Sequence, residues 1–169
     1  MIDFKKENNE VFYNTNDLPK LTKIDIKFLL EEARKNPSNK CRFCMHKNVN
    51  DQSHEMFIVH LKNCYVRPHK HLSKVESMSV IEGEADAFFF NDQGKIINKI
   101  ELGNYSSGKN FYYRIDKNLY HMLVVKSEFF IFYETTLGPF NRKDTIFPNW
   151  APSENNDDFL NQLNNYKLL

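Results

Sequence analysis

Two histidines and a glutamate stand close together in the stretch PHKHLSKVE, residues 68–76. On an extended strand, His69 and His71 share one face, because side chains alternate between the two faces. A turn over residues 72–74 and a second strand would bring the Glu76 carboxylate back beside the imidazoles. Imidazoles and carboxylates together suit a borderline divalent metal, whereas Ca²⁺ and Mg²⁺ prefer oxygen ligands. The spacing predicts these three residues as ligands of one transition-metal site.

Two further side chains would share the ligand face of a strand over residues 64–71. Arg67 there would bind a phosphate or carboxylate, because a guanidinium donates two parallel hydrogen bonds to such groups. A salt bridge at the mouth of the fold is its alternative role. Tyr65 would act as a general acid, with packing in the wall as its alternative role. We therefore expect Arg67 to bind substrate and Tyr65 to be catalytic.

A third candidate for proton transfer is Glu134, which ends the apolar run FFIFYE at residues 129–134. In a strand it would face the same side as Phe130 and Phe132. An apolar environment raises the pKa of a carboxyl group, which is the condition for a base near neutral pH. The alternative is an exposed strand end. We predict Glu134 as a catalytic residue.

The elements that must position these residues are mostly strands. Hydrophobic residues make up 41% and aromatic residues 14% of the 169 residues, which favours pleated, half-buried surfaces. Short apolar runs separated by turn residues predict strands over 56–61, 64–71, 77–83, 84–90, 95–102, 110–115, 121–126 and 128–136. Asn91 to Gly94 reads as a hairpin turn, and Gly83 marks a sharp turn at a strand end.

A helix is expected before the strands, from an N-cap at Thr22 to the stop at Asn36-Pro37, and a second, short one near the C-terminus. The fold class is therefore mainly β: a small antiparallel β-barrel or jelly roll with two helices. We expect one domain, with an arm and helix at 1–40, the barrel at 41–152 and a tail or helix at 153–169.

The charge balance and the absence of long apolar runs exclude some partners. Lys plus Arg number 23 and Asp plus Glu 22, so no net charge attracts nucleic acid. No apolar run approaches the roughly 18 residues of a membrane span. Three cysteines and a polar start predict reduced thiols in the cytoplasm.

The spacing His-x-His-x4-Glu-x6-Gly, from His69 to Gly83, resembles the first motif of the cupin superfamily. The second cupin motif is matched in part at residues 116–121, where Asp116 and Asn118 replace the usual proline and glycine. The resemblance implies His121 as the fourth ligand. It implies one divalent transition-metal ion, such as Zn, Fe, Mn, Ni, Co or Cu.

The run from Arg42 to Pro152 further resembles the WbuC-type cupin-fold metalloproteins. The matching features are CYVRPHKHLSKVESMSVIEGEADAFFFNDQGKI, LYHMLVV and ETTLGPFNRKDTIFPNWAP. This resemblance implies a metal-binding cupin of bacterial surface-polysaccharide (O-antigen or capsule) gene clusters, with an ill-defined reaction.

The pattern Cys41-x-x-Cys44-x-His46 has the form of half a zinc site. A structural zinc needs four ligands, and no second Cys/His pair follows at a matching distance. We instead expect His46, together with His54, to lie near the cavity and contact the ligand.

Three functions fit these observations. The preferred one is an isomerase or epimerase acting on a nucleotide- or phospho-sugar. The alternatives are an Fe- or Mn-dependent dioxygenase and a non-catalytic, metal-dependent module that binds a sugar or another small molecule. Cupins often dimerise through sheet edges, so a homodimer is also expected.

Overall fold

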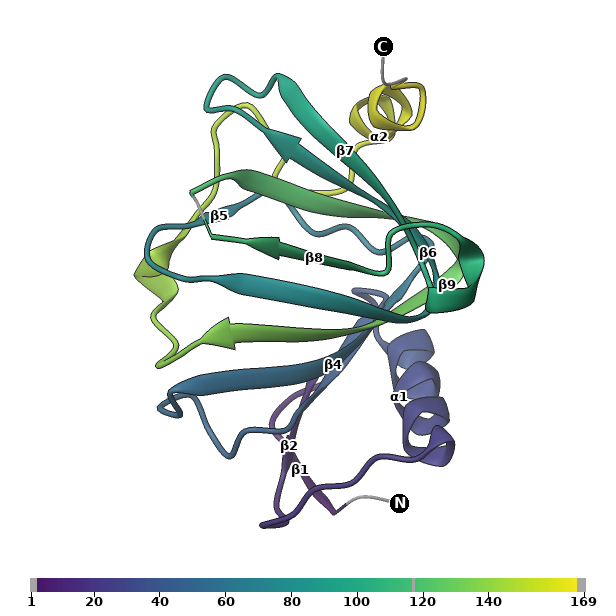
Figure 1. Ribbon diagram of the computed structural model, residues 1–169, viewed down its shortest axis with the longest axis vertical. Coiled ribbons are helices and arrows are strands. Elements are labelled where there is room, and N and C mark those ends of the chain that lie inside the picture. The colour runs from purple at the N-terminus through teal and green to yellow at the C-terminus, as the bar shows by residue number, and fades with distance from the viewer. Residues whose placement is uncertain (1–2, 117, 167–169) are drawn as a thin grey trace.

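We describe the protein from a computed structural model over residues 3–116 and 118–166 (Figure 1). Neither helix in this part of the chain is long and apolar enough to cross a membrane. In chain order the elements are β1 (Phe4–Lys6), β2 (Val11–Asn14), α1 (Lys23–Lys35), β3 (Lys40–Cys44), β4 (Ser53–Leu61), β5 (Lys70–His71), β6 (Glu76–Phe90), β7 (Ile96–Gly103), β8 (Tyr112–Ile115), β9 (Tyr120–Leu137), β10 (Thr145–Ile146) and α2 (Asp157–Asn164), with single 3-10 turns at Tyr105–Ser107 and Arg142–Asp144.

Two long bent strands, β6 and β9, form the centre of the molecule and pair antiparallel along most of their length. Their register shifts on both sides of Gly83, which has a φ of +89°. A Cβ at this position would overlap the Phe129 carbonyl oxygen, so only glycine fits this bend. The sequence predicted each long strand as two short ones. The structure instead has two continuous strands that bend and pass from one layer into the other.

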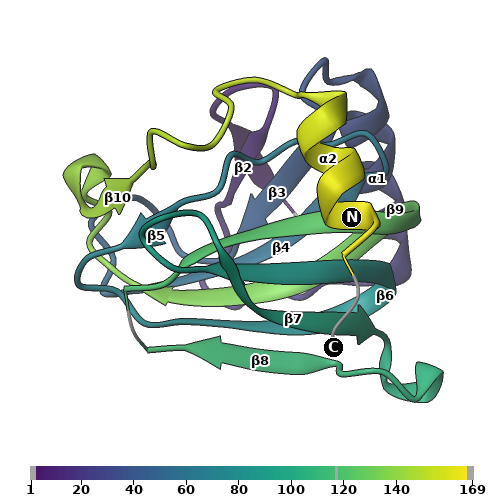
Figure 2. The same ribbon diagram turned by 90° about the horizontal axis from the view of Figure 1, so that it is seen from above.

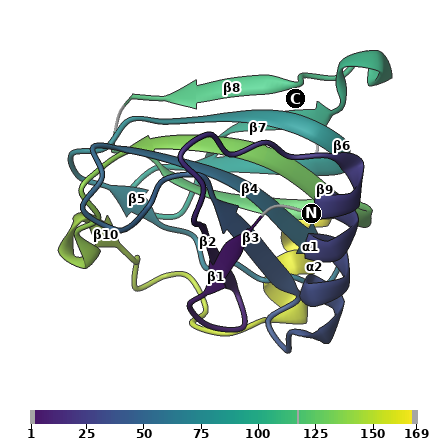
Figure 3. The ribbon, with the colours of Figure 1, turned by 90° about the horizontal axis from the view of Figure 1, so that it is seen from below.

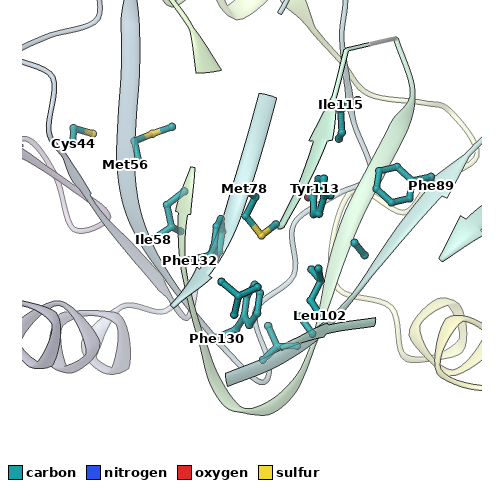
Figure 4. Close-up of a cluster of buried hydrophobic side chains, with 14 of the residues drawn as sticks. Cys44, Met56, Ile58, Met78, Phe89, Leu102, Tyr113, Ile115, Phe130 and Phe132 are labelled. Atoms are coloured by element: carbon teal, nitrogen blue, oxygen red, sulfur yellow. The ribbon is translucent and has the colours of Figure 1, made fainter. Parts of the chain in front are cut away.

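The bend creates two packed layers. The first layer contains β1, β2, β3 and β4, the halves of β9 and β6 at 129–137 and 76–83, and β8. The second contains β7 and the other halves of β6 and β9, and a bridge between His69 and His121 places the β5–β10 ribbon beside it. Figure 4 shows side chains such as Met56 and Phe132 from the first layer and Phe89 from the second in one core. The main sheet runs from β1 to β7 without closing, so a jelly roll describes it better than a closed barrel.

Helices cover the outer faces of both layers (Figures 2 and 3). α1 packs Leu29 and Ala33 against Phe43 and Val59 of the first layer. Its start is fixed as the sequence predicted, because the Thr22 amide donates to the Asp25 carboxylate at 2.8 Å. α2 packs on the second layer near Phe88, Tyr120 and Trp150. The predicted C-terminal helix is thus present, and its last predicted residues, 167–169, lie outside the described residues.

The prediction of a strand over 64–71 was wrong for residues 64–68, which join no sheet. Pro68 lacks an N–H to donate to a neighbouring strand. The side chains of Tyr65 and Arg67 instead bond to carbonyl oxygens of the C-terminal segment. The N-terminal arm holds two strands, and β2 pairs in parallel with β3. The division into 1–40, 41–152 and 153–169 stays a prediction.

Candidate metal centre and its cavity

Three histidines converge where the two layers meet. His69 and His71 belong to the segment around β5, and His121 is the second residue of β9. One ring nitrogen from each lies within 4.8 Å of the others. Reciprocal backbone hydrogen bonds join His69 and His121, with N–O distances of 3.1 Å and 2.9 Å. This bridge fixes the two imidazoles side by side before any ion is considered.

Backbone carbonyls orient two of the rings. The Nδ1 atom of His69 lies 2.9 Å from the carbonyl oxygen of Arg67, and Nδ1 of His121 lies 3.0 Å from that of Leu119. A proton on each Nδ1 donates to these oxygens and leaves the Nε2 lone pair free. Metal-binding histidines are typically held in this way by their second nitrogen. The two rings are therefore oriented as ligands.

The third histidine is positioned by its neighbours on both sides. His71 pairs with Thr145 of β10, whose Oγ1 lies 3.3 Å from Nδ1. On the other side, the Asn118 side-chain amide, with its nitrogen turned toward β5, donates to the carbonyl oxygens of His71 at 2.7 Å and Leu72 at 2.8 Å. The asparagine that replaces the usual glycine of the second motif thus attaches β5 to the loop before His121. The sequence indicated only that Asn118 stands where the second motif usually has a glycine.

Glu76 begins β6 and completes the group. Its carboxylate oxygens lie 3.3 Å from Nε2 of His71 and 3.6 Å from Nε2 of His121. Burial raises the pKa of Glu76, but the surrounding imidazoles, first that of His121, outweigh it and hold the pKa at about 2. Burial, with the neighbouring His121, lowers the pKa of His69 to about 3. Three imidazoles beside a carboxylate with a low pKa fit one divalent transition-metal ion. The structure brings together all four residues predicted as ligands.

A cavity of about 340 Å³ adjoins this group, and all six histidines of the chain line it. Its walls between the layers are largely apolar and include Met56, Ile58 and Phe132, which Figure 4 shows projecting from β4 and β9. Small-molecule sites are commonly concave, with apolar walls and a few polar groups. The cavity therefore has the form of a site for a small molecule.

Glu134 lines the cavity on the inner face of β9, where it pairs with Met78 of β6 and Met56 of β4. Burial, reinforced by the charge of Glu76, raises its pKa well above the usual value, in the direction that the sequence indicated. Burial also raises the pKa of Tyr113, which lines the same cavity. A carboxyl that accepts a proton readily thus lies near the metal ligands.

His46 and His54 also line the cavity. Their rings stack with centroids 4.1 Å apart and an interplanar angle of 10°. Burial, with the neighbouring His54 ring, lowers the pKa of His46 to about 4. Both residues lie where the sequence placed them, and their contact with a ligand stays a prediction.

Tyr65 and Arg67 are not among the residues that line the cavity. The Tyr65 hydroxyl donates to the Pro152 carbonyl oxygen at 2.7 Å, and Arg67 donates to that of Pro148 at 2.6 Å. The expectation that they share the ligand face fails because residues 64–68 form no strand. The structure gives both side chains a role in attaching the C-terminal segment, and their predicted roles toward substrate stay predictions.

The cysteine pattern does not form a second cluster in the described part of the chain. Cys41 packs in the core beneath α1, whereas Cys44 faces the core between the layers. The two thiols lie on opposite faces of β3 because they are three positions apart in a strand. The triad at His69 is the one group of metal-type ligands found among the described residues.

Comparisons with known proteins address the fold more than the chemistry. A family model described as a domain of unknown function (DUF6016) matches residues 21–102, which is 82 of the 169 residues. No curated protein matches the chain.

Among solved structures, the capsular polysaccharide assembling protein CapF from Staphylococcus aureus matches with a TM-score of 0.50 at 15% identity, over 64% of this chain and 31% of CapF. A structural-genomics protein from Shewanella oneidensis matches with a TM-score of 0.48 at 10% identity, over 58% of this chain and 63% of that one. Procruciferin, an 11S globulin from Brassica napus, matches with a TM-score of 0.49 at 14% identity, over 66% of this chain and 27% of that one.

The chain spans less than two thirds of each of these three proteins. The match to CapF, together with the two-layered topology and the two motifs, shows a cupin fold. Identities this low carry no activity from one protein to another.

Proposed function

We propose that this protein is a metal-dependent enzyme that moves a proton on a small sugar derivative, as an isomerase or epimerase does. The observation that carries the proposal is the placement of four metal-type ligands and the separate carboxyl of Glu134 around one cavity. A purely structural metal would need no adjoining cavity and no second acid.

The position of each residue in the site suggests its role in metal binding or proton transfer. His69, His71, Glu76 and His121 would hold the ion, which when bound polarises a carbonyl or hydroxyl and acidifies water. Glu134 would take a proton from the ligand and return it, because it lines the cavity apart from the four ligands. The apolar walls exclude bulk water from this exchange.

The choice of a nucleotide- or phospho-sugar has a different basis from that of the metal centre. It comes from the resemblance to the WbuC-type proteins and from the name of CapF as a capsular polysaccharide assembling protein. We propose surface-polysaccharide synthesis in the bacterial cytoplasm as the setting. We also propose one domain per chain and a homodimer, for which β1, at one end of the strand order, offers an edge.

The metal content of the purified full-length chain tests the first half of the proposal. We expect about one equivalent of one transition metal, lost in the double variant His69→Ala, His121→Ala. The matched control is His46→Ala, which lines the cavity outside the triad and should retain the metal. A wild-type protein that holds no metal and takes up none when it is supplied would refute the metal centre.

Deuterium exchange tests the second half. Nucleotide- and phospho-sugars are incubated with the metal-loaded protein in D₂O, and deuterium at carbon is followed by NMR. Glu134→Gln should abolish exchange and keep the metal, and Tyr65→Phe tests the other predicted proton donor. Iron in the purified protein together with oxygen uptake would favour a dioxygenase, and tight binding of a sugar with no turnover would favour a binding module.

A further inference from the structure

One arginine faces into the fold. Arg42 lies in the middle of β3, in register with Val11 of β2 and Ile58 of β4. Residues that pair directly across strands project from the same face of a sheet. Val11 and Ile58 belong to the core between the layers, so the Arg42 side chain leaves β3 on that inner face. It lines the cavity and remains exposed, as expected at the cavity mouth.

Arg42 has no acidic partner within ion-pair distance among the residues that the structure describes. Its guanidinium contacts the Cys44 thiol, which is only a weak hydrogen-bond acceptor. The other cations of the cavity are occupied. Lys40 lies 3.8 Å from the Glu10 carboxylate, and Lys74 lies 5.0 Å from the centre of the Phe140 ring. A guanidinium carries five donors in a planar fork that matches carboxylates and phosphates. Arg42 is therefore the cavity cation with the most unused donors.

An apolar part of the cavity wall separates Arg42 from Glu134. In the strand order, β3 and β9 are separated only by β4. Arg42 is in register with Ile58 and, beyond it, Phe132, and Glu134 lies two residues further along β9. Two strand spacings and this offset correspond to roughly 12 Å between the backbones of Arg42 and Glu134. Met56 and Ile58 of β4 fill this interval on the inner face. A small molecule whose charged end is bound by Arg42 would therefore extend along this apolar stretch toward Glu134.

We propose that the ligand of this cavity carries a carboxylate or phosphate group and that Arg42 binds it. This inference deepens the proposed function and rests on it only for the use of the same cavity. Arg42 replaces Arg67, the arginine that the sequence favoured for this role, since Arg67 is bonded to Pro148 outside the cavity lining.

Matched acid and amide probes test the anion site without knowledge of the natural ligand. Dissociation constants are measured by titration calorimetry for benzoate against benzamide, acetate against acetamide, and inorganic phosphate. The full-length wild type should prefer at least one anion over its neutral partner. Arg42→Gln should weaken that anion about tenfold or more and leave the amide unchanged, because a charge-assisted hydrogen-bond pair is lost. Comparison of the titrations with phosphate and with the carboxylates shows which anion the site prefers.

Two further variants serve as controls. Arg114→Gln removes an exposed arginine from β8, where the neighbouring Tyr113 and Ile115 face the core, so anion affinity should not change. Lys74→Gln tests a second cation of the cavity, one without an ion-pair partner among the described residues, and should have the smaller effect. Because Arg42 is exposed, its replacement should leave the unfolding midpoint unchanged.

The outcomes separate this inference from the proposed function. Equal affinity of wild type and Arg42→Gln for every anion overturns the inference, as does a selectivity that disappears only in Lys74→Gln or a panel with no preference for anions. The metal measurement is independent. A chain without metal that still binds benzoate through Arg42 would refute the proposed enzyme and leave the anion site standing.

Discussion

We expect the buried side chain of His60 to make the stability of this protein depend on pH. It faces the cavity from β4 and its ring meets that of Phe132 edge-on at 5.2 Å. Burial lowers its pKa to about 3, with smaller contributions from the charges of Lys40 and Arg42. In the unfolded chain the imidazole has an ordinary pKa of about 6.5. Between about pH 3 and pH 6.5, therefore, His60 is protonated in the unfolded state and neutral in the folded state.

The sign and size of the effect follow from linkage. Since the unfolded state binds more protons, stability falls as pH is lowered through 6.5 toward 3. At pH 7.5 both states are neutral at His60 and the contribution is close to zero. At pH 5.0 protonation of the unfolded state costs the native protein about 2 kcal/mol. Such a loss is a large share of a typical stability of about 5–15 kcal/mol.

Urea unfolding at pH 7.5 and pH 5.0 measures the effect. His60→Gln cannot take up the proton, so its free energy of unfolding should fall by about 2 kcal/mol less than that of the wild type between these pH values. Lys62→Gln, an exposed change just beyond the same strand, should follow the wild type. Equal losses in wild type and His60→Gln would show that His60 titrates normally in the folded protein and would refute the reasoning.

Four further outcomes are expected. Leu29→Ala should reduce the free energy of unfolding by about 2–5 kcal/mol in urea titrations, because Leu29 is fully buried, whereas Ile24→Ala on the exposed side of the same helix should stay within about 0.5 kcal/mol. Gly83→Ala should cost at least about 2 kcal/mol, since its φ is positive and a Cβ would overlap backbone; an unchanged urea midpoint would contradict this. Asn118→Ala should lower metal affinity about tenfold or more in competition with a chelating dye, because it releases β5; unchanged affinity would assign the amide no supporting role. Removal of metal with a chelator should speed hydrogen exchange in β5 and β10 and leave α1 unaffected; uniform exchange would place the metal elsewhere.

Three of the four metal ligands could be predicted from their spacing in the sequence because that spacing is local, whereas His121 was predicted only from the resemblance to the second cupin motif. His69, His71 and Glu76 fall within eight residues, and a strand, a turn and a strand bring them together in almost any register. Even so, the local structure differed from the expected one. Only Lys70 and His71 of the strand predicted over 64–71 form a strand. Pro68 lacks an N–H for sheet pairing, and the side chains of Tyr65 and Arg67 donate hydrogen bonds to the C-terminal segment.

Arg42 was missed for the opposite reason. Its inward direction depends on pairing with β4 and β2, and register between strands is fixed by partners far along the chain. The arm at residues 1–20 showed the same limit. Its polar, asparagine-rich composition predicts a loosely held arm or a short edge strand, whereas Phe12 of β2 is buried against Phe4, Phe43 and residues of α1.

The metal centre joins the two layers of the fold. Glu76 begins the half of β6 that lies in the first layer, whereas His121 lies in the half of β9 that belongs to the second. The β5–β10 ribbon, whose strands are two residues long each, supplies His71, and His69 immediately precedes it and bridges to His121. An ion bound by all four side chains would therefore hold together elements with few other contacts. Because binding to the folded state alone adds to stability, metal binding should stabilise the packing of β5 and β10 against β9.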